Sequence, residues 1–292
     1  MLKEQELNAL ISLLDDPDES VYYEIQAKLL SLGHPVIPLL EHAWENSFDP
    51  VLQQRIEGII HKIQFDNIEG QIQNWVRHDQ DNLLKGILLV ARYQYPDLDE
   101  KKVLRQIEQI KQDVWLELNN NLTALEKVRV LNHILFEVHG FSGNTSNYHA
   151  PQNSYLNNVL ESKKGNPISL SILYLIIAQD LNIPIYGVNL PEHFVLAYVD
   201  EENFFQTYGE EGKGKVLFYI NPFSKGAVFS SKEIDAFLKQ LKLPLEENYY
   251  EPCENSEIIR RVFRNLILAY EKLGYPSKVK ELENLLKVLN KG

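Results

Sequence analysis

Polar and ionisable side chains that could do chemistry gather between residues 153 and 223. The first of them are Asn153, Ser154, Tyr155 and Asn157. Two interpretations fit this group: it lines a polar pocket together with Lys164 and Glu192 beside His193, or it makes the capping hydrogen bonds of a loop. The pair Lys163-Lys164 either meets an anionic group at a helix N-terminus or faces solvent.

A reactive thiol and a metal site have little support in the sequence. Cys253 is the only cysteine, so the chain can form no intrachain disulfide and no zinc site built on cysteines. Its acidic neighbours Glu251 and Glu254 are expected to raise the pKa of the thiol. The eight histidines are scattered, and His133 and His139 are six positions apart, which places them on different faces of a helix. The sequence therefore predicts no metal and no cofactor.

The elements that must position these residues change character along the chain. Residues 168–181 are apolar on almost every side, which predicts a helix buried among other elements. Asn166 suits the N-cap of this helix, and Pro167 suits its first position, where a missing N–H costs nothing. A buried helix followed by an antiparallel meander predicts an α+β core. The strand-like runs of that meander are 185–190, 193–199, 203–208 and 216–220.

Helical patterns flank this core on both sides. Before it, short amphipathic runs separated by Asp-, Pro- or Gly-containing joints are typical of HEAT-like stacks. After it, residues 258–273 and 277–289 form two amphipathic segments around Gly274, which is typical of a tetratricopeptide-like hairpin. We therefore predict a mostly helical α+β chain. Its predicted domains are a HEAT-like cap at 1–78, a core at 79–245 and a tetratricopeptide-like tail at 246–292.

Several short blocks in the middle of the chain carry a family resemblance. They are Asn153-Ser154-Tyr155-Leu156, Lys164-Gly-Asn-Pro-Ile-Ser-Leu-Ser171, Gly187-Val-Asn-Leu-Pro-Glu-His-Phe194 and Ile220-Asn-Pro-Phe223. Their order and spacing closely resemble the SirB-type family, which joins a transglutaminase-like core to a tetratricopeptide tail. The resemblance is dense over residues 130–225 and extends more thinly to about residue 290.

The resemblance implies a papain-like, transglutaminase-like fold. In active members of that superfamily a cysteine begins the buried helix, a histidine follows on the next strand and an aspartate on the strand after it. The corresponding positions here hold Pro167, His193 and Asn221. Glu192 also departs from the family, which usually has glycine before the histidine. Its carboxylate is expected to repel an acidic ligand or to raise the pKa of His193.

Two side chains keep an enzymatic interpretation open. Ser169 is either a nucleophile that faces His193 or a capping residue of the helix. His193 is either a general base or a half-buried histidine held by Asn221, because an asparagine amide can still orient an imidazole. Acyl transfer through a thiol is not expected with Pro167 in the nucleophile position.

The composition narrows the possible partners. Lys and Arg number 29 and Asp and Glu number 41, which gives a formal net charge of −12. This charge disfavours nucleic acids and anionic membranes as partners, and the single cysteine suits the cytoplasm. We expect a non-catalytic, transglutaminase-like interaction or regulatory module that binds a protein or peptide. The alternative is a hydrolase or acyl- or amide-processing enzyme that uses His193 with Ser169 or a bound water.

Overall fold

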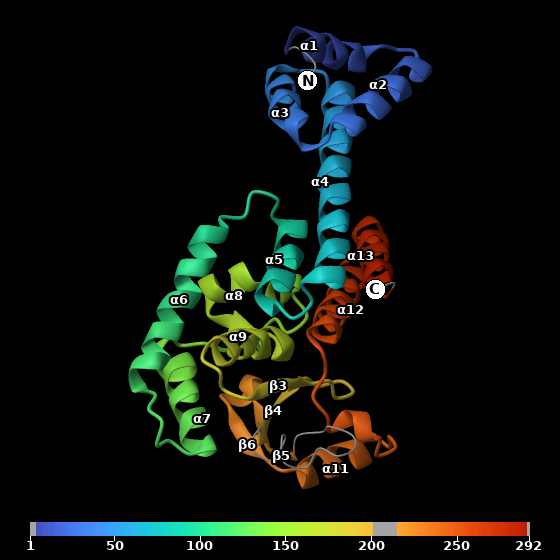
Figure 1. Cartoon of the computed structure of the whole chain (residues 1–292). Helices are drawn as coiled ribbons and strands as arrows, with labels where there is room; N and C mark the ends of the chain where they lie inside the picture. The colour runs from blue at the N-terminus through green and yellow to red at the C-terminus, as the bar shows by residue number, and fades with distance from the viewer. Residues whose placement is uncertain (1–3, 201–214, 291–292) are drawn as a thin grey trace. The chain divides into compact units, whose positions relative to one another are not determined.

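A computed structural model describes residues 4–200 and 215–290 of the chain, and Figure 1 traces them from the N- to the C-terminus. The chain divides into two compact units, Met1–Asn74 and Trp75–Gly292. The three-domain division expected from the sequence stays a prediction.

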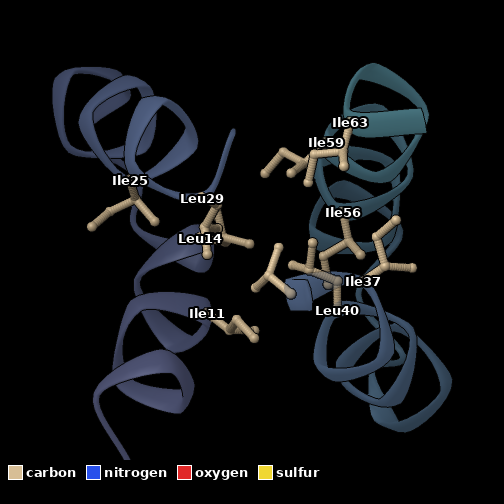
Figure 2. Packing of buried hydrophobic residues seen from close by; sticks show 10 residues of the cluster. Ile11, Leu14, Ile25, Leu29, Ile37, Leu40, Ile56, Ile59 and Ile63 are labelled. Carbon is tan, nitrogen blue, oxygen red and sulfur yellow. The ribbon is translucent and has the colours of Figure 1, made fainter. Parts of the chain in front are cut away.

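The first unit consists of several short helices and most of one long helix around an apolar core. Asp18 begins one of these helices by accepting a hydrogen bond from the Ser20 N–H at 2.8 Å, and Gly33 ends it with a φ of 67°. Figure 2 shows the buried leucine and isoleucine side chains of this core converging from facing helices. Its elements are α1 (Glu4–Ser12), η1 (Leu13–Asp15), α2 (Glu19–Leu32), η2 (His34–Val36), α3 (Ile37–Asn46) and most of α4 (Pro50–His78). The HEAT-like assignment stays a prediction.

The second unit is also largely helical, and it contains a small sheet. Its helices before the sheet are α5 (Leu83–Gln94), α6 (Glu100–Glu117), α7 (Ala124–Asn132), the π-helical η3 (His133–Val138), η4 (Pro151–Ser154), α8 (Leu156–Ser162) and α9 (Pro167–Asp180). Those that follow β5 are η5 (Pro222–Ser224), α11 (Ser231–Gln240), η6 (Glu247–Tyr249), α12 (Asn255–Leu273) and α13 (Pro276–Leu289). No helix among residues 4–200 and 215–290 is long and apolar enough to cross a membrane.

The described part of the main sheet is antiparallel, with strand order β3-β4-β5-β6. Residues 203–208, predicted as a strand, lie outside the described residues. Strand β6 was not predicted, because a run of three residues is too short to display an alternating pattern. The strands are β3 (Ile185–Val188), β4 (Val195–Asp200), β5 (Lys215–Asn221) and β6 (Ala227–Phe229), and a separate parallel pair joins β1 (Ser142–Gly143) to β2 (Lys164–Gly165).

Helix α9 forms the centre of the second unit, as its apolar sequence predicts. Every residue from Pro167 to Ala178 is buried. The helix contacts β3 and β4 on one side and α5, α6 and α8 on the other, an arrangement that Figure 1 makes visible. The structure thus confirms a mostly helical α+β chain with a buried helix packed on an antiparallel sheet.

The last two helices pack onto this core. Gly274 adopts a φ of 75° between α12 and α13, a left-handed conformation that glycine reaches at little cost. The Tyr270 hydroxyl of α12 lies 3.1 Å from the Tyr155 hydroxyl and donates to Gln94 Oε1 at 2.9 Å. These bonds fix α12 against the region around α8 and α5. The tetratricopeptide-like assignment of this hairpin stays a prediction.

Candidate functional site

The start of α9 is closed by a network of hydrogen bonds within the chain. The Asn166 side chain accepts from the Ser169 N–H at 2.9 Å, and Ser169 Oγ accepts from the Asn166 N–H at 3.0 Å. Ser169 Oγ also donates to the Asn166 carbonyl at 3.2 Å. Asn166 is therefore the N-cap and Pro167 the first residue of the helix, as the sequence predicts. The Ser169 hydroxyl is buried and its proton already has an acceptor.

His193 lies in the turn before β4, so it is not part of the strand expected at 193–199. Glu192 has a φ of 58° in this turn. The His193 ring stacks on Phe237 of α11, with centroids 5.2 Å apart. Burial lowers the pKa of His193, the positive charge of Arg261 lowers it further, and Glu192 opposes both effects. Burial and Arg261 therefore outweigh the rise in the His193 pKa that was expected from Glu192.

Asn221 lies at the end of β5 and stabilises the turn that follows. Its side-chain oxygen accepts from the N–H groups of Phe223 at 3.1 Å and Ser224 at 3.3 Å. Among the described residues, no hydrogen bond joins Asn221 to His193 or His193 to Ser169. The three side chains predicted for catalysis each hold local partners instead.

The six residues predicted to line one pocket are distributed over several environments. Ser154 and Glu192 line a hollow of about 600 Å³. Asn153 and Lys164 line a second, more polar hollow of about 540 Å³. Tyr155 is buried, and its hydroxyl forms a hydrogen bond with the Tyr270 hydroxyl. Burial raises the pKa of Tyr155. The Asn157 side-chain oxygen is buried without a hydrogen-bond partner among the described residues.

The first hollow, here called the α9–α12 hollow, opens beside Pro167 at the start of α9 and is bounded by α12. Its apolar lining comes from side chains such as Phe194 and Leu268, and α12 contributes Arg261 and Arg264. The remaining lining residues are Tyr148, His149, Ala150, Ser154, Asn166, Ile168, Glu192, Asn265 and Ala269. The position expected for a nucleophile thus borders a cavity of the size that small ligands occupy in proteins.

The two arginines were not among the predicted site residues. They are three positions apart on α12, which places them on one helix face. Arg261 lies 72 positions after Asn189, the residue whose side chain it contacts, so no local pattern connects them. The one available sequence feature was the cluster Arg260-Arg261-Val262-Phe263-Arg264 in an acidic chain.

Neither the Cys253 thiol nor a cluster of metal-ligating side chains lines this hollow in the described part of the chain. Burial raises the pKa of the Cys253 thiol to about 12, and Glu257 adds to the rise. Cys253 is not among the residues that line the hollow. No group of three or more His, Cys, Asp or Glu side chains able to hold a metal occurs among the described residues.

Comparisons with known proteins agree with this architecture. A profile of the transglutaminase-like superfamily matches residues 101–264. A UPF0162 protein of Xylella fastidiosa is 28% identical over 194 residues, which cover 64% of this chain and 64% of that protein. Human F-box only protein 21 is 26% identical over 233 residues, which cover 71% of this chain and 35% of that protein.

The likeness spans only part of these relatives. The chain matches about 64% of the length of the Xylella proteins and about a third of the F-box protein. No solved structure matches the chain significantly. The profile covers more than half of the chain, including α9, the main sheet and the first part of α12. The chain belongs to the transglutaminase-like superfamily.

Proposed function

We propose that this protein is a non-catalytic member of its superfamily and acts in the cytoplasm as a protein-interaction or regulatory module. The observation that carries the proposal is the start of α9. Pro167 occupies the position expected for the nucleophile, and proline has neither a thiol or hydroxyl nor a backbone N–H. The position therefore lacks an attacking atom and a main-chain donor for an oxyanion.

Ser169, the alternative nucleophile predicted from the sequence, is poorly prepared for attack. An activated serine needs a base within hydrogen-bond reach of its hydroxyl. Ser169 instead donates to the Asn166 carbonyl, and the described residues supply no hydrogen bond between Ser169 and His193. The stacking of His193 on Phe237 favours a packing role for the ring. These contacts weigh against a hydrolase that uses His193 with Ser169 or a bound water.

The hollow beside Pro167 supports a binding role. The α9–α12 hollow retains a cavity with apolar lining and two arginines, a combination suited to recognition. The helical segments before and after the core are each proposed to offer a separate surface for a protein or peptide, as HEAT- and tetratricopeptide-like repeats do.

A substrate panel tests the proposal. Wild-type chain is incubated with p-nitrophenyl acetate, with an amide such as a peptidyl p-nitroanilide, and with a glutaminyl peptide plus a primary amine. We expect no release of product above the buffer rate. Turnover that disappears in Ser169→Ala and His193→Ala, while both variants keep the melting temperature of wild type, would establish the enzyme instead.

A further inference from the structure

Arg261 and Arg264 bring two positive charges to the α9–α12 hollow, and Glu192 is the one acid among the described residues that line it. Arg261 donates to Asn189 Oδ1 at 2.6 Å and to the Leu190 carbonyl at 2.9 Å, both neutral acceptors. Neither Arg261 nor Arg264 forms an ion pair among the described residues. Arg261 is only partly exposed, and a half-buried cation without a counter-charge is unfavourable unless a ligand supplies one.

Two further donors border the same hollow. Ser154 is 2% exposed and its oxygen accepts from Asn166 Nδ2 at 2.9 Å, while its proton has no acceptor among the described residues. The Ile168 N–H is the first N–H of α9, because Pro167 has none, and it has no partner within the helix. Hydroxyl, amide and guanidinium donors that line one cavity suit an anion.

We propose that the α9–α12 hollow binds a carboxylate of a peptide ligand, held by Arg261 and Arg264. This inference rests on the proposed binding function and names its ligand chemistry. Apolar neighbours of the carboxylate would pack on Phe194 and Leu268, which line the same hollow. The carboxylate comes from an Asp or Glu side chain or from the peptide C-terminus.

The local charge favours a carboxylate over a phosphate. Two arginines and Glu192 line the hollow, so one positive charge remains after Glu192 is subtracted. A carboxylate balances that charge, whereas a phosphate monoester carries about −1.5 to −2 near neutral pH and leaves an excess of negative charge beside Glu192. The net charge of the whole chain is −12, and this negative charge repels a phosphate monoester more strongly than it repels a carboxylate.

A peptide selection tests the inference on the full chain. Random heptapeptides displayed with free and with amidated C-termini are selected on wild type, and a selected sequence is resynthesised with each acid replaced by its amide. We expect selected peptides to share one carboxylate. Its removal, or Arg264→Gln, should weaken binding about tenfold or more, and Glu192→Gln should strengthen it. Lys280→Gln, an equal loss of charge on α13, should change little.

An alkylation assay locates the bound peptide. The Pro167→Cys variant places a thiol at the border of the hollow, and Cys253→Ser removes the native thiol. We expect the selected peptide to slow the labelling of this thiol by iodoacetamide. Acetate should displace the peptide weakly and so restore part of the labelling rate. Inorganic phosphate should displace the peptide no better than acetate does.

Specific outcomes overturn the inference. They are a selection that yields no peptide, peptides without a carboxylate, equal losses in Arg264→Gln and Lys280→Gln, or stronger competition by phosphate than by acetate. Acid-free peptides that still protect the Pro167→Cys thiol would leave the proposed binding function intact. Cleavage of the selected peptides by wild type would contradict that function itself.

Discussion

The two sides of the α9–α12 hollow use their polar groups in opposite ways. On the α9 side, the Asn166 side chain and the Ser169 hydroxyl bond to each other's backbone and hold the helix end together. On the α12 side, the hydrogen-bond partners of Arg261 within the described part of the chain are neutral, and Arg264 is exposed. We infer that the Asn166–Ser169 cap of α9 serves stability and that the two arginines of α12 serve recognition. Substitutions on the two sides should therefore affect different measurements.

The largest effect on stability is expected from Asn166→Ala on the α9 side. The change removes the helix cap and leaves Ser154 without its buried donor at 2.9 Å. Loss of a cap and of a buried hydrogen bond should lower the free energy of unfolding by about 2–3 kcal/mol. Urea denaturation measures this loss of unfolding free energy. A loss below that of an exposed control, Asn120→Ala, would contradict a structural role for this side.

Ser169→Ala should have a smaller effect. It removes only the serine half of the reciprocal cap, so we expect a loss of about 1 kcal/mol in the free energy of unfolding. Ser171→Ala on the same helix is the matched control. Ser171 Oγ donates to the Pro167 carbonyl at 2.7 Å, a type of bond that stabilises helices little. Equal losses of unfolding free energy in the two variants would show that the serine half of the cap adds no stability of its own.

The sequence predicts the α9 side of this comparison and not the α12 side. The apolar run with Asn166-Pro167 before it is sufficient for the buried helix, because caps and periodicity are local properties. The turn at Glu192 and the ring stack of His193 on Phe237 depend on tertiary packing. Arg261 reaches the hollow only because α12 folds back onto the core, which no spacing near residue 167 reveals.

The pH dependence of stability tests the environment of His193. The folded state lowers the pKa of His193 from the ordinary value of 6.5, so the unfolded chain binds more protons near and below that pH. Stability should therefore be highest above about pH 6.5 and fall as the pH drops through the folded pKa. His193→Gln should flatten this fall in urea titrations between about pH 5 and 8. An unchanged slope, equal to that of the exposed control His42→Gln, would count against the assignment.

The smallest effect on stability is expected from Arg264→Gln on the α12 side. Arg264 is exposed and has no ion pair among the described residues, so the free energy of unfolding should change by less than about 0.5 kcal/mol. A larger loss would show that this side also supports the fold. The contrast with Asn166→Ala would then disappear.

The central claim is that no side chain at the start of α9 attacks a substrate. The direct measurement is peptide mapping by mass spectrometry after treatment with a fluorophosphonate, which labels activated serine hydroxyls, and with iodoacetamide, which labels reactive thiols. We expect no adduct on Ser169, and no adduct on Cys253 while the chain is folded. An adduct on Ser169 that is lost in His193→Ala would contradict it.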